Sequence, residues 1–118
     1  MTPDLLLWLT LCCSVYQVEP AFARAVMVIE SREQIGPLGR KGTFIGPFGI
    51  HKDFRKKWDI DDPRENIRVG VAALRGKDKL RVLRRYNTKS NRSYEQAVMA
   101  CYRQYRGAPV QSTPRMRP

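Results

Sequence analysis

Apolar residues recur every three or four positions along most of the chain, a pattern that predicts an almost entirely helical protein. The first helix is expected to run from about Pro3 to Tyr16. Thr2 can cap its start, Pro3 suits the first helical position, and Asp4 places an acid in the first turn. A second helix is expected from Ala21 to about Ser31.

More helices are expected downstream. A short one covers His51–Trp58. The next begins at Asp62-Pro63-Arg64-Glu65, where an Asp cap, a first-position Pro and a Glu three residues after the cap form a strong start signal, and Gly76 ends it. Lys79–Tyr86 forms another helix. Ser93-Tyr94-Glu95-Gln96 repeats the capping pattern and is expected to start the last helix.

The segment from Arg32 to Gly49 interrupts this pattern. It contains five glycines and two prolines, which exclude a long helix, so a loop is expected, with a short β-ribbon around Thr43-Phe44-Ile45. A loop of this length inside a compact domain is usually functional. Ala108–Pro118 has three prolines and no periodicity and is expected to be disordered. The predicted fold class is therefore mainly α, with one domain over residues 1–107 and a basic tail over residues 108–118.

Charge narrows the class of partner. Twenty-two Lys and Arg residues against eleven Asp and Glu residues give a formal net charge of +11, which implies a polyanionic partner. Nucleic acid, an anionic membrane surface and bacterial wall polymer all qualify, and composition does not choose among them. The runs Arg55-Lys56-Lys57 and Arg81 to Arg85 fit either solvated helix faces or attraction to an anionic wall.

The cysteines and the single histidine argue against a metal site. Cys12, Cys13 and Cys101 are odd in number and lack a CxxC spacing, which disfavours a disulfide framework and zinc. Buried free thiols are expected, and one bridge from Cys101 to the early pair remains an alternative. His51 has no nearby Cys pair and is expected at the surface. No cofactor or metal is expected.

The apolar stretch Leu5–Val15 raises the question of targeting. It is too short to span a bilayer. A signal peptide would require a basic residue before the apolar stretch, and the residues before Leu5 include none. It is therefore assigned to the first helix. Neither a signal peptide nor stable membrane insertion is expected.

Glu30 is the residue that a structural account explains least. It follows Phe22 and Val26 at helical spacing on the apolar side of its helix, and it lies near the predicted helix end, where the macrodipole disfavours negative charge. Both effects favour the protonated form and predict a raised pKa, which suits a general acid that protonates a glycosidic oxygen. The alternative is a partly exposed helix-end glutamate paired with Arg24 or Arg32.

Four segments around and after Glu30 follow one another at plausible spacing. They are Tyr16–Ser31, Gly46–Ile50, Asp62–Leu74 and Arg85-Tyr86-Asn87. In this order they resemble the motifs of the soluble lytic transglycosylases: an aromatic-x-Val-x-Pro-Ala turn before a helix ending in Glu-Ser, a Gly-Leu-Met-Gln stretch, an Asp-Pro-x-x-Asn-Ile-x-x-Gly helix, and Ala-Tyr-Asn. The resemblance covers roughly Leu5 to Tyr105. It implies a compact lysozyme-like helical domain in which the Gly-rich loop or β-ribbon forms one wall of a cleft.

The resemblance implies that Glu30 is the single catalytic acid/base. It would protonate the leaving oxygen of the β-1,4 bond between N-acetylmuramic acid and N-acetylglucosamine, then accept the proton of the sugar's own C6 hydroxyl, giving a 1,6-anhydro product. Ser31 would orient the substrate or Glu30, Tyr86 would hydrogen-bond the Glu30 carboxyl through its phenol, and Asn87 would shape the cleft. The alternatives are a core tyrosine at Tyr86 and a helix C-cap at Asn87.

One motif departs from the family. Gly49 stands where the family has Gln, so a polar contact to the substrate is missing or supplied elsewhere. Phe48 stands in the place of Met, where it either stacks on a sugar face or fills the core. Ordinary glycosidases use two carboxylates, yet Gly36–Gly49 contains no acid, and Asp53 is expected in a surface salt bridge. An internal hydroxyl as nucleophile removes the need for the second carboxylate.

Peptidoglycan glycan strands are thus the expected partner, and nucleic acid is not expected. A monomer is expected, acting at the bacterial cell wall in the periplasm or after delivery by a phage. Three alternatives remain open. One is a muramidase resembling goose-type lysozyme, and another is an inactive relative that binds the wall. The third is a basic helical nucleic-acid-binding protein, against which the basic residues are spread along the whole chain.

Overall fold

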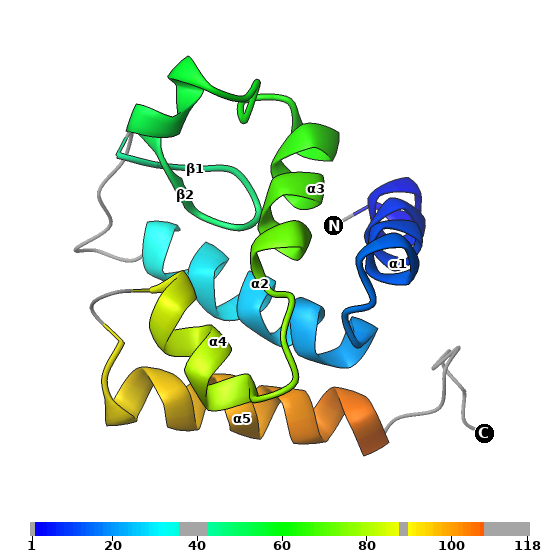
Figure 1. Ribbon diagram of the computed structural model, residues 1–118, viewed down its shortest axis with the longest axis vertical. Helices are drawn as coiled ribbons and strands as arrows, with labels where there is room; N and C mark the ends of the chain where they lie inside the picture. The colour runs from blue at the N-terminus through cyan, green and yellow to red at the C-terminus, as the bar shows by residue number, and fades with distance from the viewer. Residues whose placement is uncertain (1, 36–42, 88–89, 108–118) are drawn as a thin grey trace.

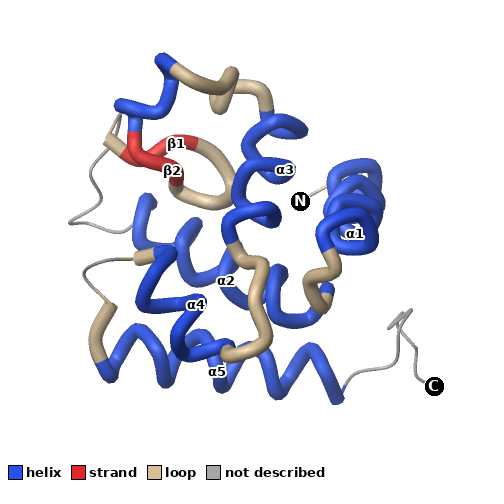
Figure 2. Tube along the Cα trace, viewed as in Figure 1, coloured by secondary structure: helices blue, strands red, loops and turns tan. Residues whose placement is uncertain are grey.

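The computed structural model describes residues 2–35, 43–87 and 90–107 (Figure 1). This part of the chain is mainly helical, as predicted, with one small antiparallel hairpin (Figure 2). Its elements are α1 (Pro3–Tyr16), α2 (Pro20–Ile35), β1 (Phe44–Ile45), β2 (Ile50–His51), the 3-10 helix η1 (Lys52–Lys56), α3 (Pro63–Ala73), α4 (Lys79–Tyr86) and α5 (Arg92–Gly107). The predictions for the glycine-rich residues 36–42 and for the tail 108–118 fall outside the described residues.

Side-chain caps start several of these helices. The Thr2 hydroxyl accepts the Leu5 N–H at 3.2 Å, and the Asp62 carboxylate accepts the Arg64 N–H at 3.2 Å, so both predicted caps are confirmed. The predicted start of the last helix is wrong. The Asn91 side chain accepts the Tyr94 N–H at 2.8 Å, and α5 therefore begins before Ser93.

The second helix is longer than predicted. It continues to Ile35, so Glu30 lies more than one helical turn before its end. The influence of the macrodipole fades within the last turn, and the helix-end argument about the Glu30 charge is therefore wrong. The apolar-stripe argument is confirmed, because Phe22 and Val26 are buried on the same side of α2.

The hydrophobic core surrounds α2. This helix crosses the middle of the molecule and packs against α5, while α1 packs against α3 (Figure 1). Cys12 and Cys13 are buried on α1, Cys101 is half-buried on α5, and all three thiols are free. Burial raises the pKa of the Cys13 thiol to about 12, so the thiol stays protonated at neutral pH. No helix in the described ranges has the length and apolarity needed to cross a membrane.

The predicted β-ribbon is confirmed as the β1–β2 hairpin. Phe44 pairs with His51 and Ile45 with Ile50, and residues 46–49 form the connection. Gly46 adopts a φ of 72°, a conformation that glycine tolerates best. The helix predicted over His51–Trp58 is instead the short 3-10 helix η1, capped by the His51 side chain.

Candidate functional site

Glu30 lies in the interior of the protein. Its side chain is 9% exposed, and Glu30 and Asn66 are the buried polar or charged side chains of the described ranges. The alternative of an exposed glutamate paired with Arg24 is wrong, because Glu30 is buried and the Arg24 guanidinium lies over the Tyr105 ring, 4.4 Å from its centroid. The Arg32 side chain is outside the described part. A buried carboxyl is expensive unless it is hydrogen-bonded, so its partners define the site.

Tyr94 donates a hydrogen bond to this carboxyl. Its hydroxyl donates to Glu30 Oε2 over 2.7 Å, and the two residues come from α5 and α2. Burial raises the pKa of the Tyr94 phenol, and the charge and the hydrogen bond of Glu30 raise it further. Tyr94 is therefore a neutral donor throughout the physiological range.

Tyr86 has a different partner from the one predicted. Its hydroxyl donates to the Phe48 carbonyl oxygen at 2.7 Å, so its one proton is not directed at the Glu30 carboxyl. The predicted donation from Tyr86 is thus corrected, and Tyr94 takes that role. Burial raises the pKa of Tyr86, and the Glu30 charge raises it further, which places the phenol within electrostatic reach of the acid.

Asn87 takes the helix C-cap role that was the alternative for it, and its role in shaping a cleft stays a prediction. It is the C-cap residue of α4, and its backbone N–H donates to the Leu83 carbonyl at 2.9 Å. Its side chain also hydrogen-bonds Tyr94, which lowers the pKa of that phenol and partly offsets the effect of Glu30. Asn87 therefore helps to fix the tyrosine that contacts the acid.

Glu30, Tyr94, Tyr86 and Asn87 are called the Glu30 cluster below. Ser31 and Phe48 join this cluster to the hairpin. The Ser31 hydroxyl donates to the Pro47 carbonyl oxygen at 3.0 Å, tying α2 to the β1–β2 connection. Phe48 is fully buried and fills the core, so the prediction that its ring stacks on a sugar is wrong. Its carbonyl, rather than its ring, serves the site by accepting the Tyr86 proton.

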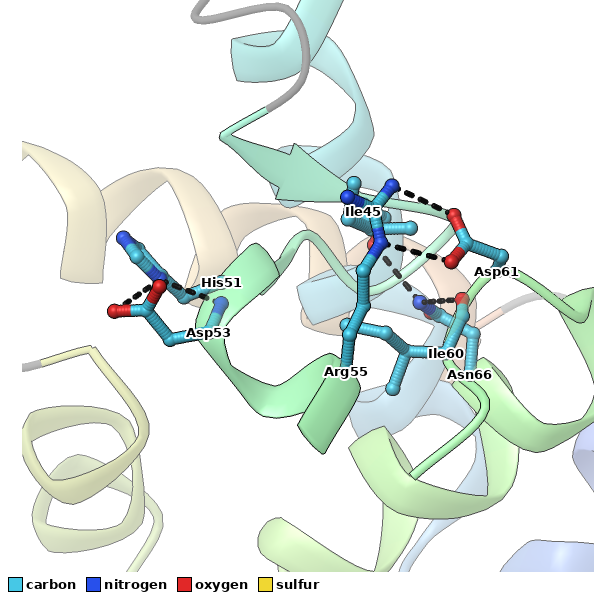
Figure 3. A network of polar contacts seen from close by, with 7 residues as sticks. All are labelled: Ile45, His51, Asp53, Arg55, Ile60, Asp61 and Asn66. Carbon is cyan, nitrogen blue, oxygen red and sulfur yellow. Dashed lines mark hydrogen bonds and ion pairs between the residues drawn. The ribbon is translucent and has the colours of Figure 1, made fainter. Parts of the chain in front are cut away.

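Asn66 on α3 holds the connection in place and was not singled out from the sequence. Its Nδ2 donates to the Ile45 and Ile60 carbonyls at 2.8 and 3.0 Å, two bonds drawn in Figure 3, and its Oδ1 accepts the Phe48 N–H at 2.9 Å. We call these three bonds the Asn66 bridge. A Cβ atom at Gly46 would collide with the Asn66 side chain. The Asn in the Asp-Pro-x-x-Asn segment was the available signal.

Gly70 completes the contact between α3 and the hairpin. A Cβ atom there would collide with the Phe48 ring, so the helix and the β1–β2 connection approach each other as closely as glycine permits. The hairpin and α3 are therefore packed as one block beside the Glu30 cluster.

Several other carboxylates of the described ranges pair with bases nearer the surface. Glu65 pairs with Arg68 at 2.7 Å and Glu95 with Arg84 at 3.0 Å. Asp53, predicted to pair with nearby bases, lies 3.5 Å from His51 Nδ1 and is largely exposed. Glu30 thus differs from these acids in burial, and the side chain of Glu33 is outside the description.

The described residues contain no group of three or more His, Cys, Asp or Glu side chains that could hold a metal ion. Comparison of the chain with models of protein families, with curated proteins and with solved structures gave no match. The geometry of the Glu30 cluster therefore carries the functional argument by itself.

Proposed function

We propose that this protein is a peptidoglycan-cleaving enzyme of the lytic transglycosylase type, built on a lysozyme-like helical domain, with Glu30 as its acid/base. One observation carries the proposal: a carboxyl group that is 9% exposed accepts a 2.7 Å hydrogen bond from Tyr94. An ionisable group kept in the interior costs stability, and such groups concentrate at functional sites.

The reaction needs one carboxyl group in two protonation states. Protonated Glu30 gives its proton to the glycosidic oxygen as the bond from that oxygen to C1 breaks. The C6 hydroxyl oxygen of the same sugar then bonds to C1, and its proton passes to the Glu30 carboxylate, which restores the acid. The products are a free hydroxyl on one fragment and a 1,6-anhydro ring on the other, and no water is consumed. Because the nucleophile belongs to the substrate, proximity replaces a second carboxylate.

Tyr94 acts as a positioning residue in this scheme. Its hydrogen bond fixes one carboxyl oxygen and favours the ionised form, while burial favours the neutral form. Replacement of Tyr94 by Phe removes the hydrogen bond but keeps the burial, so the Glu30 pKa is expected to rise. Activity that requires protonated Glu30 should then persist to higher pH than in the wild type. An unshifted pH profile of cleavage would contradict this role.

The substrate class follows from the charge and the site together. A net charge of +11 favours an anionic polymer such as the bacterial wall, and salt is expected to weaken the attraction. We place the protein at the wall as a monomer acting on glycan strands. Ser31 would hold the hairpin beside the acid through its bond to Pro47, and Asn87 would support Tyr94, which binds the acid. Gly49 cannot make the polar contact of the Gln found in the resembled family, so substrate preference is expected to differ.

Product analysis tests the proposal directly. Purified peptidoglycan is digested with the wild type and with Glu30→Gln, which keeps the size and polarity of the side chain but cannot transfer the proton. Mass spectrometry is expected to find anhydro-muropeptides in the first digest and none in the second. Reducing-end muramic acid would identify a hydrolase resembling goose-type lysozyme. Absence of cleavage, together with salt-sensitive DNA binding, would favour a nucleic-acid-binding protein instead.

A further inference from the structure

The segment between β2 and α3 forms a second cluster of groups suited to binding, and none of them belongs to the Glu30 cluster. It surrounds a shallow surface depression of about 330 Å³. The residues that line the depression are Arg55, Lys56, Lys57, Trp58, Asp59 and Asp61. In Figure 1 this segment follows the hairpin on the side away from α5.

The Trp58 ring, partly buried against the core, lines the depression, and the exposed Phe54 ring lies beside it, outside the lining. Phe54 stacks on Trp58 with ring centroids 5.7 Å apart and planes inclined by 25°. Phe54 is 47% exposed, although burying such a ring would stabilise the fold. Lys57 Nζ lies 4.8 Å from the centroid of the Trp58 ring. A stacked aromatic pair at the surface, rather than a scattered apolar side chain, is typical of a binding surface.

Polar groups in fixed positions surround the rings. The Arg55 guanidinium binds both carboxylate oxygens of Asp61, at 2.8 and 2.9 Å, as Figure 3 shows. This two-point contact orients the planar group at the rim of the depression. Asp59 and Asp61 add acceptors, and Lys56 and Lys57 add donors. The depression therefore offers an apolar face with donors and acceptors around it.

We propose that this depression, which we call the Trp58 site, is an accessory glycan-binding site that holds a sugar ring of an amino-sugar strand. A sugar has an apolar face for the rings and hydroxyl or acetamido groups that both donate and accept hydrogen bonds. Three bases, Arg55, Lys56 and Lys57, face two acids, Asp59 and Asp61, in the lining, and this net positive charge suits the acidic substituents of a wall strand. The partly apolar Trp58 ring favours a sugar over a phosphate polymer, which the oligothymidylate measurement below tests. The inference rests on the proposed function, because it takes the substrate strand as the ligand.

A second contact on one strand would raise affinity without new chemistry. A long strand bound at the Trp58 site presents its other sugars at a high effective concentration. The Trp58 site would therefore affect binding and KM more than the chemical step at Glu30.

Trp8 provides a matched control for Trp58. It also has a cation over its ring, Arg64 at 5.4 Å, but its indole N–H donates to the Arg64 carbonyl, and it lines no part of the depression. In the Trp8→Phe variant, Trp58 is the remaining tryptophan, so soluble N-acetylglucosamine oligomers should change the fluorescence. In Trp58→Phe, where Trp8 remains, they should not.

Co-sedimentation with purified sacculi measures the same site in the Glu30→Gln variant, which removes cleavage from the measurement. Adding Trp58→Ala is expected to weaken binding about tenfold. Phe54→Ala and Lys57→Gln change exposed side chains and should each weaken binding severalfold; Lys57→Gln should keep the melting temperature, and Phe54→Ala should lower it only slightly through the lost stacking on Trp58. Trp8→Phe should bind like its parent.

Unchanged sacculus binding in the Phe54→Ala and Trp58→Ala variants would overturn the inference. The same holds if these variants lose binding to oligothymidylate but still bind sacculi. The two proposals fail separately. A wild type that releases no muropeptides but loses sacculus binding on Trp58→Ala contradicts the proposed function alone. A wild type that cleaves, with Trp58→Ala binding normally, contradicts the Trp58 site alone.

Discussion

Two Tyr–Glu hydrogen bonds connect the α2 region to α5, and they differ only in their surroundings. Tyr102 donates to Glu19 at 2.7 Å just before α2 begins, and Tyr94 donates to Glu30 at 2.7 Å within the helix. The Glu19 side chain is 39% exposed and lies 3.5 Å from Lys79 Nζ, whereas Glu30 is 9% exposed. The bond length is the same, so the bond does not distinguish a structural contact from a candidate acid.

Burial makes the distinction. At Glu19, water and the Lys79 ammonium group screen the charge, and the pair ties two helices together. At Glu30, the charge acts through the interior and raises the pKa of Tyr86 as well as that of Tyr94. A carboxyl that affects two phenols at once is coupled to its surroundings in a way that suits proton transfer.

The largest expected difference between the pairs is in activity. Glu30→Gln should reduce the rate of peptidoglycan cleavage about 10²- to 10⁴-fold, the usual contribution of a general acid. Glu19→Gln should leave the rate within about twofold, because that pair only connects helices. Release of soluble fragments from labelled sacculi measures both. Equal losses in the two variants would remove the functional distinction.

Stability should separate the two tyrosines next. Tyr94→Phe leaves a buried carboxyl without its phenol donor and should lower the free energy of unfolding by about 1.5–3 kcal/mol. Tyr102→Phe should lower the free energy of unfolding by less than about 1 kcal/mol, because water can replace the phenol at half-exposed Glu19. Urea denaturation at neutral pH gives both values. A larger loss for Tyr102→Phe would reverse the comparison.

Alkaline pH sharpens the contrast in the same variants. The pKa of Tyr94 is raised above the value of an unfolded tyrosine, about 10, first by burial and then by Glu30. The folded state therefore holds this proton more tightly, and the resulting stability is present below about pH 10 and lost as pH rises through the folded pKa. Tyr94→Phe should make the fall in unfolding free energy above about pH 10 less steep. A denaturation series from about pH 8 to 11 tests this, and an unchanged slope would contradict it.

Lys79→Gln should have the smallest effect. Lys79 lies near Glu19 and over the rings of Phe22 and Tyr102, at 5.5 and 5.3 Å, in a partly exposed setting. Replacing it should lower the free energy of unfolding by less than about 1 kcal/mol, and this loss should shrink in high salt. A double-mutant cycle with Tyr102→Phe measures the coupling within this pair. A strong coupling would mean that the Glu19 region is more desolvated than its exposure indicates.

Local signals in the sequence predicted much of the fold. The caps at Thr2 and Asp62 lie next to the helices they start, and the stripe of Phe22, Val26 and Glu30 reports which side of α2 faces the core. The end of α2 was predicted too early. The Ser31 boundary came from the change in composition over Arg32–Gly49, although the residues after Ser31 contain no proline or glycine before Gly36.

The partner of Glu30 depended on long-range packing, which periodicity does not reveal. Tyr94 is buried and Tyr86 is partly buried against the core, and a phenol in either setting needs a hydrogen-bond partner. Their separation along the chain does not say which of them faces the acid. The structure resolves this because the Phe48 carbonyl, from the β1–β2 connection, takes the Tyr86 proton.

The Asn66 bridge has a consequence for how the molecule can open. Pulling the hairpin away from α3 would break the two Asn66 bonds to the Phe48 N–H and the Ile45 carbonyl at once and separate Gly70 from Phe48. The hairpin and α3 are therefore expected to move together as one unit. The hydrogen bonds Ser31–Pro47 and Tyr86–Phe48 join this unit to α2 and α4, so they would resist its separation from the Glu30 helix.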